Sequence, residues 1–178
     1  MAHHALVAYE RPDGRYDIHT SRWGGFDCHL ADAISPTDPY AGDAIDPAPR
    51  VVARPFGDVL TMVDPARHEA LYRVSAEYVV DTYLPLWFGL GHYLGESLLN
   101  GGPGDCQPDG LVVAVDSPAD AEAFREWFAA AKDTVAEAVV GGYLSRTDAR
   151  AVLADAVSQR GASRKVFAPW SERETNEY

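Results

Sequence analysis

The stretch that decides the fold is ALVAYERPDGRYDIHTS, residues 5–21. An apolar run at residues 5–10 is joined to an alternating segment at residues 15–21 by Pro12-Asp13-Gly14. Proline presets φ at the first turn position, and glycine takes the positive φ that completes a short connection. The stretch therefore predicts a β-hairpin.

Alternation in the second strand predicts which of its side chains meet the core, because neighbouring residues of a strand point to opposite faces. Tyr16, Ile18 and Thr20 are expected to face the core. The polar residues are expected to line the other side of the sheet: Arg15, Asp17, His19 and Ser21.

The middle of the chain predicts a loop, a short helix and a second hairpin. Residues 35–55 hold five prolines and indicate an ordered surface loop, and residues 56–63 indicate a short amphipathic helix. Strands are expected at 69–74 and 77–84, and residues 85–90 could continue the second one past a bulge at Pro85. Residues 100–110 indicate a glycine-rich loop.

The last third predicts a strand at 111–115, two helices and a strand at 165–168. Ser117-Pro118 indicates the start of the first helix, which Gly141-Gly142 ends, and Ser145 with Asp148 indicates a capping box that opens the second. Hairpins first and helices last predict an α+β fold, an antiparallel sheet covered on one face by two C-terminal helices. We expect a single domain over residues 1–170 and a charged, flexible tail over 171–178.

The charge composition indicates a saline environment. Two lysines, Lys132 and Lys165, stand against thirteen arginines and twenty-seven carboxylates, with a formal net charge of −12. At molar salt the Debye length is about 3 Å, so the self-repulsion of such a surface largely disappears. An acidic mesophilic protein is the alternative. The acidity also disfavours nucleic-acid binding, except at a local basic patch.

The same composition predicts a soluble protein of a reducing, high-salt cytoplasm. No apolar run reaches the length of a membrane helix, and the N-terminus lacks the pattern of a secretion signal. Cys28 and Cys106 are far apart, without the CxxC spacing of a zinc or redox site. The sequence predicts no cofactor.

The opening ALVAYERPDG, followed by Tyr16, His19, Ser21 and Trp23-Gly24, resembles a family of small acidic haloarchaeal proteins of unknown function. A second landmark of the resemblance is Trp87-Phe88-Gly89-Leu90. It implies a source among halophilic archaea or their viruses, hence a cytoplasmic or virion-associated protein. It implies no activity, cofactor or catalytic residue.

Histidines are the first candidates for a metal site, because neutral imidazole is the commonest protein metal ligand. His4, Asp17 and His19 could lie near one another if the hairpin forms in the expected register. Polar residues on a solvated sheet face show the same pattern, and no HxH or HExxH spacing supports the metal.

Other candidate sites have simpler structural explanations. Cys28 beside His29 would need a remote histidine, His68 or His92, to act as a nucleophile, and a buried apolar cysteine explains it better. Residues 101–105 lack the ending of a phosphate loop. Asp116 and Asp120 are explained as helix-cap residues rather than as a catalytic acid pair.

The tryptophans suggest a binding surface. Trp23, Trp87 and Trp170 lie beside turns or glycines, and Arg22 precedes Trp23. Tryptophan and arginine often anchor protein interfaces, although core packing explains tryptophan equally well. We expect a non-catalytic interaction or assembly protein, binding a protein partner or a second copy through Arg22, Trp23 and Trp87.

Two other functions remain open. One is a small hydrolase or metal-dependent enzyme built on the N-terminal histidines. The other is a nucleotide or nucleic-acid binder, which requires a cluster of five arginines: Arg22, Arg50, Arg54, Arg67 and Arg73.

Overall fold

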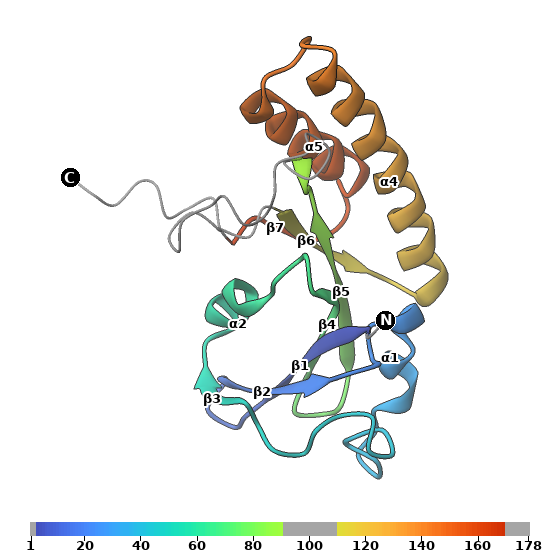
Figure 1. The fold of residues 1–178 in the computed structure, drawn as a ribbon. Helices are drawn as coiled ribbons and strands as arrows, with labels where there is room; N and C mark the ends of the chain where they lie inside the picture. The colour runs from blue at the N-terminus through green and yellow to red at the C-terminus, as the bar shows by residue number, and fades with distance from the viewer. Residues whose placement is uncertain (1–2, 91–109, 170–178) are drawn as a thin grey trace, which may run out of the picture.

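The computed structural model describes residues 3–90 and 110–169. Its centre is a seven-stranded sheet with the strand order β3-β2-β1-β4-β5-β6-β7 (Figure 1). The strands are β1 (His4–Glu10), β2 (Tyr16–Ser21), β3 (Val51–Arg54), β4 (His68–Val74), β5 (Val80–Trp87), β6 (Gly110–Val115) and β7 (Val166–Phe167). The helices are η1 (Phe26–Cys28), α1 (Leu30–Ala33), α2 (Phe56–Met62), α4 (Pro118–Val140) and α5 (Arg146–Arg160).

The predicted first hairpin is confirmed. β1 and β2 pair antiparallel from Glu10 opposite Tyr16 to Ala5 opposite Ser21. In the turn, the Gly14 amide donates to the Arg11 carbonyl over 2.9 Å, and Gly14 has φ of +73°. The Pro12-Asp13-Gly14 turn therefore closes the hairpin, as its residue types predict.

The sheet is not purely antiparallel. β4 and β5 form the expected second hairpin, with Leu71 opposite Tyr83. However, β4 lies parallel to β1, with Leu6 opposite Leu71. Residues 11–67 separate these two strands in the sequence, and the long connection from β2 to β4, residues 22–67, lets the chain return parallel to β1. The expectation of an antiparallel sheet was wrong at this one pair, and β2–β3 and β6–β7 are joined by long connections rather than by hairpin turns.

Both faces of the sheet are buried, not one. Tyr16 and Ile18 face the core as predicted, and they pack with Leu6 and with Val59 and Leu60 of α2. On the opposite face, the core joins β1 and β4 to α4 and α5, with Val7, Tyr72, Phe124 and Leu153 among its members. A second apolar layer therefore lies where a solvated, polar face was expected.

The polar row on β2 is consequently covered rather than solvated. His19 and Ser21 are only 5 % and 2 % exposed. The His19 ring donates from Nδ1 to the Asp46 carbonyl over 2.8 Å, and the Ser21 hydroxyl donates to the Ala44 carbonyl over 2.6 Å. The loop that precedes β3 packs over this face and satisfies both polar groups.

Residues 35–55 are less irregular than expected, because β3 forms at their end and pairs with β2. The short helix predicted at 56–63 is confirmed as α2. The bulge expected at Pro85 is absent: β5 runs on to Trp87, and its pairing with β4 ends at Tyr83. Pro85 therefore lies where β5 pairs only with β6, a position that tolerates a missing amide hydrogen.

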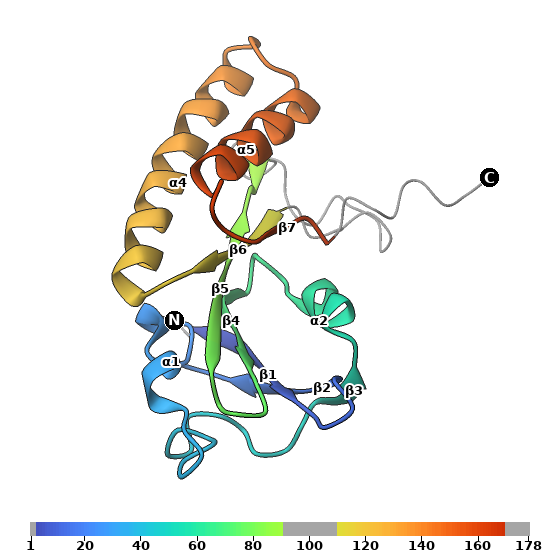
Figure 2. The same ribbon diagram turned by 180° about the vertical axis from the view of Figure 1, so that it is seen from behind.

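The two C-terminal helices begin and end as their capping residues predict. The Ser117 hydroxyl accepts from the Asp120 amide, and that of Ser145 accepts from the Asp148 amide, each over 3.1 Å. Figures 1 and 2 show α4 and α5 side by side at one end of the sheet, beyond β6, rather than spread over a whole face. None of the described helices is both long and apolar enough to cross a membrane.

β7 confirms the last predicted strand. The predicted loop at 100–110 falls almost wholly, and the tail at 171–178 entirely, outside the described residues.

The Trp87-to-Leu90 segment shows why glycine stands at position 89. Gly89 has φ of +57°, and a Cβ there would lie 2.9 Å from the Trp87 ring. Both the left-handed backbone and the close indole therefore require a residue without a side chain.

We predict that Gly89→Ala lowers the free energy of unfolding by roughly 1 to 2 kcal/mol. The left-handed backbone conformation is unfavourable for alanine, and the added methyl group would contact the Trp87 indole too closely. Gly57→Ala is the matched control. Gly57 lies in α2, and a Cβ added there would meet no atom within 4 Å, so alanine should cause no loss. Urea unfolding at fixed salt measures both, and equal stabilities of the two variants would contradict this account.

Candidate functional site

Two large apolar side chains project from the segment between β2 and α1. We call residues 21–28 the aromatic loop. Trp23 is 55 % exposed and Phe26 is 54 % exposed, and Arg22 beside them is also exposed. A pair of half-exposed aromatic rings next to an arginine is typical of the residues that dominate protein interfaces.

Hydrogen bonds to the backbone hold the aromatic loop in place. The Gly24 amide donates to the Ser21 hydroxyl over 2.9 Å, and its carbonyl accepts from the Tyr72 hydroxyl over 2.6 Å. The Gly25 amide donates to the His3 carbonyl over 2.8 Å. Ser21 and Tyr72 are buried in the sheet, so the loop is fixed to the core.

Close packing requires the two glycines of this loop. A Cβ on Gly24 would lie 2.2 Å from Leu30 Cδ1, and one on Gly25 would lie 2.7 Å from Glu69 Cβ. Asp27 and Cys28 follow with φ of 50° and 52°, values that non-glycine residues adopt rarely. The loop is therefore held in a specific, locally strained conformation.

Arg125 of α4 ties this loop to the rest of the molecule. Its Nη2 donates to the Glu69 carbonyl over 3.0 Å and to the Gly25 carbonyl over 3.5 Å, and it lies 3.7 Å from Cys28 Sγ. A single guanidinium thus joins the helix, strand β4 and the aromatic loop. An arginine inside a helix gives no sequence signal for such a role.

His3 extends the aromatic surface. Its ring centroid lies 5.2 Å from that of Phe26 and 6.3 Å from that of Trp23. Its Nδ1 lies 2.8 Å from a Glu69 carboxylate oxygen. The aromatic patch therefore comprises Trp23, Phe26 and His3 with Arg22 at its side, and Glu69 forms its border.

Trp87, the third residue expected at an interface, lies elsewhere, at the end of β5. It is partly buried, and its carbonyl accepts from Lys132 Nζ over 3.3 Å. The structure brings Arg22 and Trp23 together as neighbours in one loop, but it does not place Trp87 in that loop.

The three metal candidates have separate hydrogen-bond or strand partners. Asp17 accepts from Arg11 over 3.0 Å and from the Ala53 amide over 2.9 Å, whereas His19 is bonded to the Asp46 carbonyl. His4 is opposite His68 in the β1–β4 pair. Within residues 3–90 and 110–169, no three His, Cys, Asp or Glu side chains form a group that could hold a metal ion.

Cys28 is packed as a small apolar residue. It is 1 % exposed, and burial raises the pKa of its thiol although nearby Arg125 acts in the opposite direction. His68, one possible remote base, instead accepts the Asp64 amide at its Nδ1 over 2.8 Å. His92, Cys106 and residues 101–105 lie outside the described residues.

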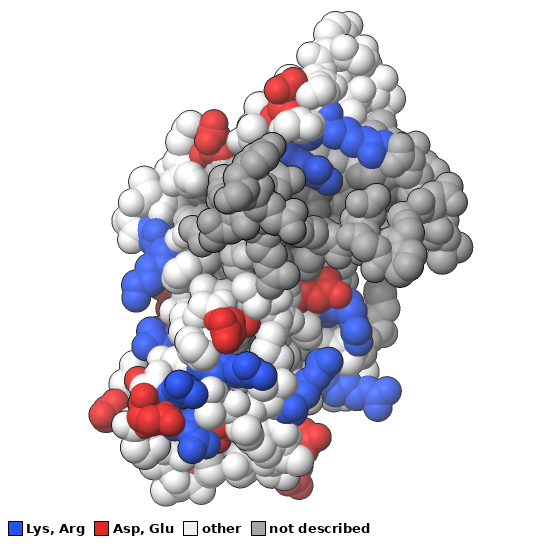
Figure 3. Space-filling model, turned by 90° about the vertical axis from the view of Figure 1, so that its left-hand side faces the viewer, with Lys and Arg blue, Asp and Glu red and all other residues white. Residues whose placement is uncertain are grey.

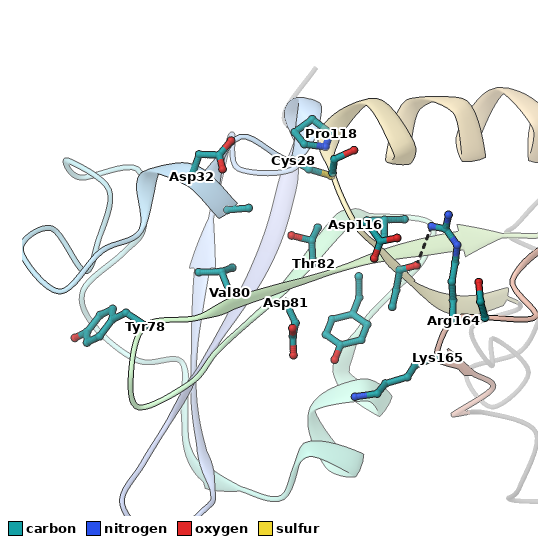
Figure 4. A pocket seen from close by; sticks show the side chains of 16 residues that line it. Cys28, Asp32, Tyr78, Val80, Asp81, Thr82, Asp116, Pro118, Arg164 and Lys165 are labelled. Atoms are coloured by element: carbon teal, nitrogen blue, oxygen red, sulfur yellow. Dashed lines mark hydrogen bonds between the residues drawn. The ribbon is translucent and has the colours of Figure 1, made fainter.

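An open groove of about 660 Å³ lies where β5, β6 and the start of α4 meet. Figure 4 shows that the carboxylates of Asp32, Asp81 and Asp116 lie apart in it, so they form no acid pair. Arg164 on the same wall is bonded to the Asp120 carboxylate and to the Ala114 carbonyl.

That ion pair lowers the pKa of Asp120, chiefly through the Arg164 hydrogen bonds. The Asp120 carboxylate also accepts the Asp116 amide over 2.9 Å, so Asp120 serves the helix start, whereas Asp116 takes part there through its backbone amide. The Asp120–Arg164 pair of this wall is therefore engaged in structure.

The five arginines required for a nucleic-acid site do not form one cluster. Arg73 donates to the Tyr16 hydroxyl over 2.8 Å and stacks on Phe56, while Arg54 is opposite Tyr16 in the sheet. Arg22 lies beyond the other end of β2. Figure 3 views the side that carries β3 and α2, where lysine and arginine side chains alternate with acidic ones.

Titration of His68 makes the free energy of unfolding depend on pH. Its pKa is lowered to about 4, chiefly by burial; Asp64 opposes this shift, and nearby Arg67, His4 and Arg50 add to it. The unfolded chain has a histidine pKa near 6.5, so it binds a proton first as the pH falls. The folded state should thus lose stability progressively between about pH 6.5 and pH 4.

We predict that His68→Asn removes roughly 2 kcal/mol of this pH dependence, after allowance for solvent screening. Asparagine keeps an acceptor for the Asp64 amide but cannot titrate. The measurement is the free energy of unfolding at pH 7, 5.5 and 4 for wild type, His68→Asn and the exposed control His29→Asn. Parallel pH profiles for wild type and His68→Asn would show that His68 does not titrate as described.

Comparison with known protein families finds a match. The model of a protein family described as "Family of unknown function (DUF6735)" matches residues 1–47 and 42–166. No curated protein and no solved structure matches the chain.

Proposed function

We propose a function from the geometry of the site, because the chain belongs to the Family of unknown function (DUF6735), a description that names no activity. The protein is a non-catalytic interaction or assembly component. It binds a protein partner through the aromatic patch of Trp23, Phe26 and His3, with Arg22 beside it.

The observation that carries this proposal is the combination of exposed rings and a fixed backbone. Trp23 and Phe26 are each more than half exposed, yet their loop is bonded to Ser21, Tyr72 and Arg125. Solvation of such rings is unfavourable in the free protein, and a partner that covers them restores apolar contact. A loop that is already ordered also loses little conformational entropy on binding.

The charge next to the patch suggests the chemistry of the partner. Arg22 is exposed and forms no ion pair with any residue that the structure describes. The chain as a whole has a formal charge of −12. A partner segment that places an apolar side chain on the patch and a carboxylate beside Arg22 complements this surface.

The proposed setting is a haloarchaeal cell, either its high-salt cytoplasm or a virus that assembles there. Support comes from the excess of acids and the near absence of lysine. Molar salt screens exposed ion pairs but does not weaken apolar contacts, and so favours an interface built on aromatic rings.

We predict that the tagged protein retains a stoichiometric protein partner from a haloarchaeal lysate in molar potassium chloride. The double variant Trp23→Ala/Phe26→Ala should reduce the retained partner at least tenfold, because truncation of interface aromatics typically costs about 2 kcal/mol or more. Mass spectrometry identifies and quantifies what is retained.

The matched control is Tyr143→Ala. Tyr143 is 86 % exposed in the turn between α4 and α5, far from the aromatic loop in Figure 1, and its loss should leave the retained amount unchanged. A partner retained equally by the double variant, or the absence of any stoichiometric protein, would exclude the aromatic patch as the binding surface.

A further inference from the structure

The chain itself contains a segment whose chemistry suits the aromatic patch. Residues 170–178 read WSERETNEY and follow the last described strand, β7. This segment, the acidic segment, combines aromatic rings with three glutamates and one arginine. Its aromatic and acidic members are Trp170, Tyr178, Glu172, Glu174 and Glu177. A ligand of the patch needs the same combination, an apolar ring and a carboxylate close to it in the sequence.

The patch offers a matching pair of features. Trp23 and Phe26 present half-exposed rings, and the exposed guanidinium of Arg22 adjoins Trp23 in the chain. Side chains alternate along an extended chain, so Trp170 and Glu172 would lie on the same side of an extended acidic segment. The indole could then cover the two rings while a carboxylate approaches Arg22.

The position of the patch favours the acidic segment of another molecule over that of the same chain. The described chain ends after β7, which is an edge strand of the sheet. Figures 1 and 2 show the end of β7 on one side of the molecule and α1, which follows the aromatic loop, on the other. A second copy can bring its segment to the patch directly, whereas the same chain would have to pass around the sheet.

The net charge sets the conditions under which two copies can meet. Each chain has a formal charge of −12, so copies repel one another in dilute salt. At molar salt the Debye length is about 3 Å, and the repulsion is largely screened while contacts between aromatic rings persist. The tests below are therefore made in molar potassium chloride.

We propose that the aromatic patch of one copy binds the acidic segment of a second copy, with Trp170 on the rings of Trp23 and Phe26 and a glutamate beside Arg22. This inference rests on the proposed function, because it names the occupant of the same patch. Each copy offers one patch and one segment, so the contact is head-to-tail and joins copies into a closed ring or an open series.

The first test is the oligomeric state of the full chain, measured by analytical ultracentrifugation over a range of protein concentrations. Wild type should self-associate. Trp170→Ala and the double variant Trp23→Ala/Phe26→Ala should each weaken self-association at least tenfold, as truncation of an interface aromatic typically does. Tyr143→Ala, a change at an exposed ring far from both, should match wild type. A monomeric wild type, or association undiminished in Trp170→Ala, would overturn the proposal.

Mixing the two variants tests which surfaces meet. Trp170→Ala keeps an intact patch and the double variant keeps an intact acidic segment, so the mixture should form a complex that neither variant forms alone. If patches bound each other, or if the acidic segment bound the patch of its own chain, the mixture would form no such complex, and the proposal would fail. Partner retention from a lysate is measured without altering Trp170, so failure of this contact and failure of the proposed function give different results.

Discussion

The hydrogen bonds of Arg125 connect the parts of the structure on which the site depends. The guanidinium reaches from α4 to the carbonyls of Glu69 in β4 and Gly25 in the aromatic loop, and it lies against Cys28 Sγ. A guanidinium that donates to carbonyl groups in a partly buried position is worth more than a surface contact, because charge-assisted hydrogen bonds are stronger than neutral ones. The same side chain therefore stabilises the loop that displays Trp23.

Local chemistry made part of this fold predictable. The Pro12-Asp13-Gly14 turn, the Ser117 cap and the Ser145 cap each depend on residues within a few positions of one another, and all three form as expected. The parallel pairing of β1 with β4 was not predictable in this way, because it depends on the path of residues 22–67. The burial of His19 was missed for the same reason: the covering loop supplies the acceptor, Asp46, from far along the chain.

The residues of the candidate site also fall into two groups, those with a local sequence signal and those without one. Trp23 and Arg22 were found because tryptophan beside arginine and glycine is a local pattern typical of interfaces. His3 and Arg125 join that site only through contacts between distant segments, so their individual positions carry no signal. His19 is explained by its burial under the loop that precedes β3, and Cys28 by its packing in the apolar core.

The central claim, that Arg125 holds the aromatic loop in its binding conformation, is tested most directly by hydrogen–deuterium exchange in Arg125→Met and Arg125→Lys. The account predicts that amide exchange in residues 22–28 becomes at least tenfold faster in Arg125→Met, with a smaller increase in Arg125→Lys, which keeps the charge but loses the planar fork. Glu126→Ala, a change at the exposed neighbouring position, should match wild type. Exchange in residues 22–28 that is unchanged in Arg125→Met, in a protein that is otherwise folded, would contradict the account.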